Sequence, residues 1–104
     1  MSWLVACRRD DIPARRGWPV RVGERNLAVF DLGDALVAVD NECRHVGNPI
    51  DDGAVSGSCV TCPWHGWRYD LRTGELLTMF GRRPGLRTYP IRVESGEVLV
   101  ELPE

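Results

Sequence analysis

Cys43-Arg44-His45 forms one cysteine–histidine pair, and Cys62-Pro63-Trp64-His65, after sixteen intervening residues, forms a second. Within each pair the thiolate and the imidazole are so close along the chain that they can only reach a common centre. Together Cys43, His45, Cys62 and His65 supply two sulfur and two nitrogen ligands. That donor set suits an iron–sulfur cluster or a tetrahedral zinc ion, so the sequence predicts a metal site.

Length and composition indicate one globular domain spanning residues 1–104. The chain has 104 residues, of which 43% are hydrophobic and 27% are charged, and these are ordinary values for a folded domain. The formal net charge of −2 argues against a nucleic-acid partner, because proteins that bind nucleic acid usually carry a strong basic excess.

The first residues do not read as a targeting segment. The apolar run within Met1–Cys7 has no preceding positive region and leads directly into Arg8-Arg9-Asp10-Asp11. We therefore expect a cytoplasmic protein with no membrane partner. In a reducing compartment, four cysteines favour metal binding over disulfides.

Short strands between turn signals predict an all-β fold. We expect strands at the following ranges, with one weak helical turn within Asp10–Arg16: Trp3–Cys7, Val20–Val22, Asn26–Leu32, Leu36–Asp40, Tyr89–Glu94 and Glu97–Leu102. In Leu36–Asp40 both alternating sets are apolar, which is typical of a strand packed on both faces. Between the two groups of strands lies a segment rich in Gly, Cys, Pro, His and Trp. We interpret this segment, Asn41–Pro84, as a small cluster-binding subdomain inserted into an antiparallel β-sandwich or barrel.

The residues around the ligand pairs resemble the signature of the Rieske [2Fe–2S] family. The matching features are Cys-x-His-x-Gly at 43–47, Cys-Pro-x-His-Gly-Trp-x-Tyr-Asp at 62–70, Thr73-Gly74 and the closing Tyr-Pro-x-x-x-Glu-x-Gly-x-Val at 89–98. The resemblance implies a Rieske-type fold with one [2Fe–2S] cluster per chain. It implies that Cys43 and Cys62 bind one iron and that His45 and His65 bind the other. A third loop, Arg83-Pro84-Gly85, would cover the cluster.

Departures from the high-potential members of this family predict a soluble ferredoxin of low potential. Rieske proteins of cytochrome bc complexes have a disulfide between the two loops, but this chain has Asn48 and Trp64 at those positions. Their serine hydroxyl near the cluster is replaced here by Trp67, whereas the tyrosine hydroxyl is retained at Tyr69. Fewer hydrogen bonds to sulfur stabilise the reduced cluster less, so the potential should lie low in the Rieske range.

Counting histidines excludes an oxygenase centre in this chain. A mononuclear oxygenase iron needs two further histidines, but the chain has only His45 and His65. We therefore predict a one-electron carrier with no catalytic site of its own. Its expected partners are redox proteins, with a flavin reductase as donor and a terminal oxygenase as acceptor. The alternatives are the small subunit of an assimilatory NAD(P)H nitrite reductase and, in another class, a zinc-binding interaction module.

Other residues in this region receive less specific interpretations. Trp64 and Trp67 are expected to be packing residues. Cys7 and Cys59 are expected to be small, partly buried hydrophobic residues, although Cys59 and Cys62 also form the Cys-x-x-Cys spacing that the zinc alternative would use.

Overall fold

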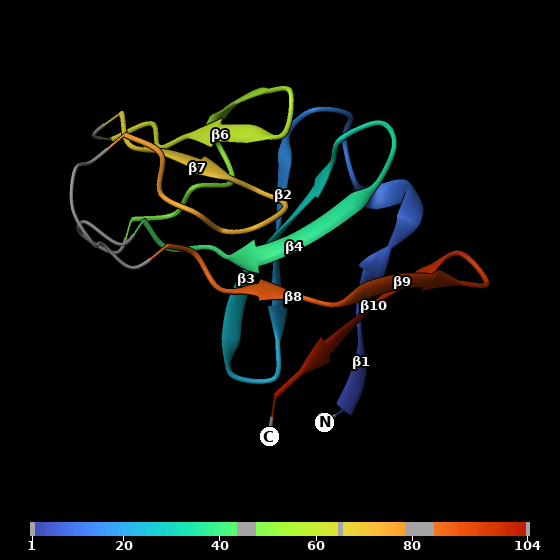
Figure 1. The fold of residues 1–104 in the computed structure, drawn as a ribbon. Helices are drawn as coiled ribbons and strands as arrows, with labels where there is room; N and C mark the ends of the chain where they lie inside the picture. The colour runs from blue at the N-terminus through green and yellow to red at the C-terminus, as the bar shows by residue number, and fades with distance from the viewer. Residues whose placement is uncertain (1, 44–47, 65, 79–84, 104) are drawn as a thin grey trace.

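The structure is a computed structural model that describes residues 2–43, 48–64, 66–78 and 85–103. Within these residues it contains ten strands and one 3-10 turn, η1 (Arg9–Asp11) (Figure 1). The strands are β1 (Ser2–Arg8), β2 (Gly17–Val22), β3 (Arg25–Asp31), β4 (Leu36–Asp40), β5 (Ala54–Ser56), β6 (Cys59–Thr61), β7 (Arg68–Asp70), β8 (Thr88–Tyr89), β9 (Ile91–Glu94) and β10 (Glu97–Leu102). The strand pairs within the three sheets are antiparallel, which confirms the predicted all-β class.

The central sheet, in the order β2-β3-β4-β8, separates two hydrophobic cores. Along β3, Ala28 and Phe30 contribute to one core while Leu27 and Val29 contribute to the other. Successive side chains of a strand point to opposite faces, so this fully apolar strand is buried on both sides. β4 alternates in the same way, as the sequence predicted for Leu36–Asp40.

One core lies between the central sheet and the sheet formed by the two chain ends. This terminal sheet has the order β1-β10-β9, and Val98 and Val100 of its middle strand are fully buried in the core. Figure 1 shows the two ends of the chain next to each other beside β1 and β10. Cys43 and Cys62 belong to the other core, so the terminal sheet lies away from these two cysteines.

The other core lies between the central sheet and a small sheet that is inserted into it. The chain leaves the central sheet after β4, forms β5-β6-β7, and returns at β8, which pairs with β4. The small sheet packs Val60 and Tyr69 against Phe30 and Val39 of the central sheet. The insertion thus shares a core with the central sheet.

A polar network fixes the strand on which the chain returns from the insertion. The Tyr89 hydroxyl of β8 donates to Asp40 at 2.5 Å and accepts a hydrogen bond from Arg25 at 3.1 Å. Burial raises the pKa of Tyr89, and the neighbouring Asp40 carboxylate raises it further, so the phenol stays protonated and remains a donor. The network joins β3, β4 and β8 at the base of the insertion.

Most of the predicted strands are found, and two expectations need correction. β4 and β10 match the predicted ranges Leu36–Asp40 and Glu97–Leu102. The predicted strand Tyr89–Glu94 is two strands, because the chain passes at Pro90 from the central to the terminal sheet. The expected turn within Asp10–Arg16 is shorter and earlier, at Arg9–Asp11. In the part of the chain described here, no helix is long and apolar enough to cross a membrane.

Candidate metal centre

The two loops that carry Cys43 and Cys62 are each closed by a backbone hydrogen bond of the same kind. In the first loop, which follows β4, the Cys43 N–H donates to the Asn48 carbonyl at 2.7 Å. In the second loop, between β6 and β7, the Cys62 N–H donates to the Trp67 carbonyl at 2.7 Å. Each bond spans five residues, so the two loops reverse the chain over the same length. This shared geometry was not part of the sequence prediction.

The two cysteines are buried in one and the same core. Cys43 and Cys62 are each 1% exposed, and both belong to the core that contains Tyr69 and Leu71. Neither of them forms a disulfide. The residues beside them face outward: Glu42 and Pro63 are exposed. Each described loop therefore has an inner side with a thiol and an outer side toward solvent.

Tyr69 places a hydroxyl at the first of these sulfurs. Its side chain is fully buried on β7, and its oxygen lies 3.4 Å from Cys43 Sγ, within hydrogen-bonding distance for sulfur. If Cys43 is a thiolate, only the phenol can donate. The structure thus places the Tyr69 hydroxyl beside a cysteine sulfur, as the family resemblance implied.

The sequence-predicted ligands are only partly covered by the structure. Cys43 and Cys62 are described, whereas His45 and His65 lie outside the described residues, as do Arg83 and Pro84 of the expected covering loop. Among the described residues, no group of three or more His, Cys, Asp or Glu side chains could hold a metal ion. The ligand assignment of Cys43, Cys62, His45 and His65 therefore stays a prediction.

Cys59 and Cys7 are separated from this pair of thiols. Cys59 precedes Val60 on β6, and because strand side chains alternate, it points away from the core that Val60 enters. Cys7 lies on β1 in the terminal sheet, where burial and the nearby Asp11 raise the pKa of its thiol. Both are half-buried free thiols, as expected. The Cys-x-x-Cys spacing thus does not bring Cys59 to Cys43 and Cys62.

The two tryptophans of the second loop have different environments. Trp67 packs against the core around the cysteines, which confirms its predicted packing role. Trp64 is 62% exposed, so the same prediction was wrong for it. The sequence indicates a large aromatic residue but not whether another segment covers it. An exposed indole beside a ligand loop is a candidate contact for another protein.

Gly66 explains how the second loop turns so sharply. Its φ of 74° lies in the left-handed region, and its N–H donates to the Cys62 carbonyl at 3.0 Å. A side chain at this position would strain the backbone. Gly66 therefore permits the tight turn of the second loop.

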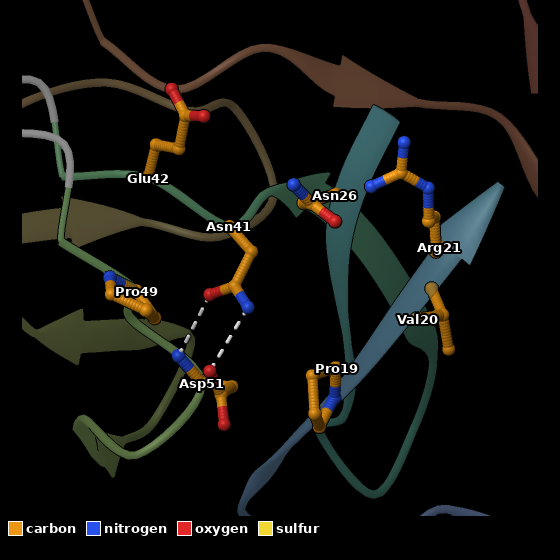
Figure 2. A pocket seen from close by; sticks show the side chains of 8 residues that line it. All are labelled: Pro19, Val20, Arg21, Asn26, Asn41, Glu42, Pro49 and Asp51. Atoms are coloured by element: carbon orange, nitrogen blue, oxygen red, sulfur yellow. Dashed lines mark hydrogen bonds between the residues drawn. The ribbon is translucent and has the colours of Figure 1, made fainter. Parts of the chain in front are cut away.

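A pocket lies beside the first loop, between that loop and strands β2 and β3 (Figure 2). It is lined by Pro19, Val20, Arg21, Asn26, Asn41, Glu42, Pro49 and Asp51. None of these is a cysteine or histidine. Figure 2 shows the Asn41 side chain directed at Asp51 across the base of the loop. We assign no ligand to this pocket.

The described donors fit an iron–sulfur cluster. A bound metal deprotonates its thiol ligands, so Cys43 and Cys62 can bind iron as thiolates. A [2Fe–2S] core with two thiolates and two neutral imidazoles has no net charge when oxidised. The apolar residues around Cys43 and Cys62 suit such a group better than one with four thiolates.

Comparison with known proteins identifies the family. The Rieske [2Fe-2S] domain family matches residues 2–90, and the chain therefore belongs to it. Its cofactor is accordingly a Rieske [2Fe–2S] cluster, which favours the iron–sulfur prediction over the zinc alternative.

Several relatives of this chain are ferredoxins. The ferredoxin component of the naphthalene 1,2-dioxygenase/salicylate 5-hydroxylase systems of Ralstonia sp. is 30% identical over 101 residues, covering 97% of this chain and 96% of that protein. The Sphingomonas yanoikuyae B1 ferredoxin superposes with a TM-score of 0.87 at 27% identity, covering 98% of this chain and all of that one.

Two further solved structures bear on the predicted partners. One chain in the complex of reduced oxygenase and oxidised ferredoxin of carbazole 1,9a-dioxygenase has a TM-score of 0.81 and 31% identity, covering 94% of this chain and 91% of that one. A putative nitrite reductase small subunit has a TM-score of 0.84 at 20% identity, covering 98% of this chain and all of that one. The second likeness establishes a shared fold alone.

The hydrogen bond from Tyr69 to Cys43 predicts a measurable effect on potential. The Tyr69→Phe variant removes the only donor that this side chain offers to the sulfur, so the reduced state loses stabilisation. We expect the midpoint potential to fall by roughly 20–65 mV, the one-electron equivalent of a hydrogen bond of about 0.5–1.5 kcal/mol. Redox titration followed by visible absorbance measures the shift. A potential within about 5 mV of wild type would contradict the assignment.

Proposed function

We propose that this chain is the ferredoxin component of a multicomponent oxygenase system. In this role Cys43 and Cys62 bind one iron of the cluster, and His45 and His65 bind the other. The bound cluster supplies one-electron transfer at a potential low in the Rieske range. The single observation that carries the proposal is the pair of matching loop closures at Cys43 and Cys62, which present two buried thiols from one core.

The proposed donor is a flavin reductase and the proposed acceptor is a terminal oxygenase. Relatives whose names state a role are ferredoxin components of dioxygenase systems, which supports an oxygenase acceptor. Figure 1 shows the chain ends beside β1 and β10, away from β6 and β7, which flank the second loop. We further propose that residues 1–104 form one domain with a cluster-binding subdomain at about 41–84, and that the protein is cytoplasmic.

The nitrite reductase alternative has weaker support. Its solved representative shares the fold at 20% identity, whereas the ferredoxin of carbazole 1,9a-dioxygenase from Nocardioides aromaticivorans IC177 is 26% identical. Reconstitution separates the two candidates. The purified protein, reduced with a flavin reductase and NADH, should reoxidise when a terminal oxygenase and its aromatic substrate are added. Reoxidation only by a sirohaem nitrite reductase with nitrite would favour the alternative.

The ligand set is tested by serine substitutions with matched controls in the same chain. We expect Cys43→Ser and Cys62→Ser each to abolish the visible spectrum and bound iron, because a serine hydroxyl is a poor ligand for this cluster. Cys7→Ser and Cys59→Ser should retain both, since neither thiol lies in the core with Cys43 and Cys62. Alanine at His45 or His65 should also remove the spectrum. Loss of iron in the Cys59 variant but not in the Cys43 variant would overturn the assignment.

The exposed Trp64 predicts a contact with the electron acceptor. We expect Trp64→Ser to lower the rate of electron delivery to the terminal oxygenase by about ten-fold, as for an interface anchor worth about 1.4 kcal/mol. The visible spectrum should not change. The control is Trp18→Ser, because Trp18 is also exposed, at 38%, but lies on β2. Equal rates in the two variants, measured by stopped-flow reoxidation, would contradict a role for Trp64.

A further inference from the structure

Asn41 is an unusual residue in the interior of this fold. It is 8% exposed, and among the described residues it is the only buried one with an amide or charged side chain. It follows β4 directly, two positions before Cys43, and its backbone N–H donates to the Asn26 carbonyl of β3 at 3.0 Å. Since burying an amide is costly unless its hydrogen bonds are satisfied, its partners decide what it does.

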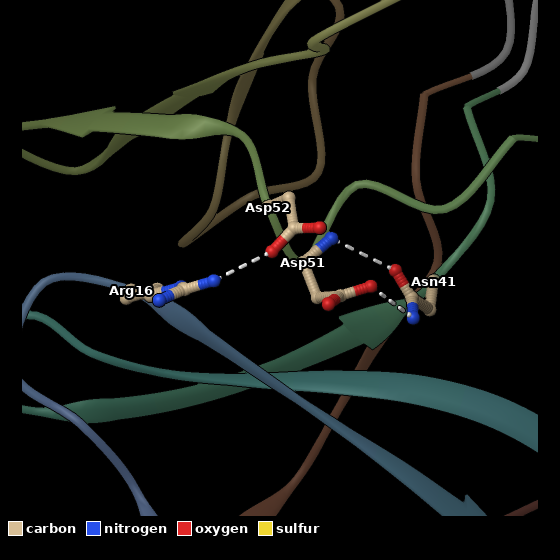
Figure 3. Close-up of polar contacts among 4 residues, drawn as sticks. All are labelled: Arg16, Asn41, Asp51 and Asp52. Atoms are coloured by element: carbon tan, nitrogen blue, oxygen red, sulfur yellow. Dashed lines mark hydrogen bonds and ion pairs between the residues drawn. The ribbon is translucent and has the colours of Figure 1, made fainter.

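All the side-chain partners of Asn41 lie at the far end of the first ligand loop (Figure 3). Its Oδ1 accepts hydrogen bonds from the backbone N–H groups of Ile50 at 2.8 Å and Asp51 at 3.0 Å. Its Nδ2 donates to Asp51 Oδ1 at 2.9 Å. One amide therefore joins the two ends of the segment that contains Cys43 and His45.

The second ligand loop shows what this amide replaces. Outward from the bond between Cys62 and Trp67, the next residue pairs are partners in the ladder of β6 and β7: Thr61 with Arg68 and Val60 with Tyr69. In the first loop, the residues two positions outside Cys43 and Asn48 are Asn41 and Ile50, which correspond to Val60 and Tyr69. β4 and β5, the strands on either side of this loop, lie in different sheets and do not pair. The Asn41 side chain takes the place of the missing ladder.

The far end of the first loop is itself firmly anchored. The Asp51 carbonyl accepts a hydrogen bond from the Gly17 N–H at 3.1 Å, and Asp52 pairs with Arg16 at 2.9 Å (Figure 3). A Cβ on Gly17 would lie 2.7 Å from the Asp51 Cα, so only glycine allows this approach. Asn41 thus connects the end of β4, two residues before Cys43, to a point that is bonded to β2.

We propose that Asn41 is the positioning residue of the first ligand loop, with Asp51 as its partner. Its amide fixes the distance between the two ends of the loop. It thereby sets how tightly the loop holds its side of the cluster, and it influences the midpoint potential of the cluster. The inference rests on the proposed ligand role of Cys43 and His45. Supporting groups around metal ligands commonly change metal affinity by about 10–100-fold when they are removed.

The amide chemistry predicts which substitutions at this position succeed. Alanine removes all three hydrogen bonds. Aspartate can still accept from both backbone N–H groups, but its second oxygen then faces the Asp51 carboxylate, and two like charges at this distance repel. In the double variant Asn41→Asp/Asp51→Asn, the donor and the acceptor are exchanged and every bond can form again.

The test compares the holoproteins of wild type, N41A, N41D, D51N and N41D/D51N. The control is V98A, which creates a cavity in the core beneath the terminal sheet, since Val98 is fully buried there. Three quantities are measured: the rate of loss of the visible spectrum under a chelator, the midpoint potential, and hydrogen exchange at the amides of Ile50 and Asp51.

We expect N41A and N41D to lose the cluster at least about ten-fold faster than wild type and to shift the potential, with faster exchange at residues 50 and 51. N41D/D51N and D51N should remain within about three-fold of the wild-type rate. V98A should lower the unfolding temperature yet leave the potential and the exchange at these two amides unchanged. If N41A yields no holoprotein, the rates of cluster loss of N41D and N41D/D51N decide whether Asn41 has the positioning role.

The failures of the two proposals are distinguishable. A wild-type protein without a Rieske signal overturns the ligand set on which the inference rests. A wild-type protein with that signal, combined with N41A losing the cluster no faster than V98A, overturns the positioning role of Asn41 alone. If N41D/D51N loses the cluster as fast as N41D, the positioning role of Asn41 is also overturned, because the double variant can form all three hydrogen bonds again.

Discussion

The structure depends most on one backbone interaction that occurs twice: a cysteine N–H bonded at 2.7 Å to the carbonyl five residues further on, from Cys43 to Asn48 and from Cys62 to Trp67. Each bond reverses the chain so that the cysteine faces the core while neighbouring residues face solvent. In sequence, each bond also encloses the histidine of its pair. The two loops are therefore equivalent units, although one is attached to a strand ladder and the other to an asparagine amide.

The surroundings of the two loops match the electrostatics of the cofactor. The core between the central sheet and the insertion is apolar apart from the Tyr69 hydroxyl and the thiols themselves, in the part of the chain that is described. A group with large net charge is costly in such surroundings. A cluster in which two neutral imidazoles replace two thiolates avoids that cost when oxidised, and accepts an electron more readily than a cluster with four thiolates.

The sequence predicts this fold well where a pattern repeats locally, and less well where distant segments decide the outcome. β4 and β10 were predicted because short apolar runs lie between clear turn signals. The change of sheet at Pro90 and the exposure of Trp64 depend on which segments lie alongside, and residue type does not reveal that. Asn41 was not singled out either, since its partners lie nine and ten residues further along the chain and only the folded loop brings them together. The ligand pairs were recognised from their spacing, and the structure places Cys43 and Cys62 in one core.

We propose that the two cysteine–histidine pairs, each in a loop closed by the same kind of backbone hydrogen bond, share one two-iron cluster. Pulsed electron paramagnetic resonance of the dithionite-reduced protein, with histidine labelled by ¹⁵N, tests it most directly. We expect hyperfine couplings from two directly bound imidazole nitrogens, one from His45 and one from His65. A reduced cluster with one coupled imidazole, or with none, would overturn this ligand set.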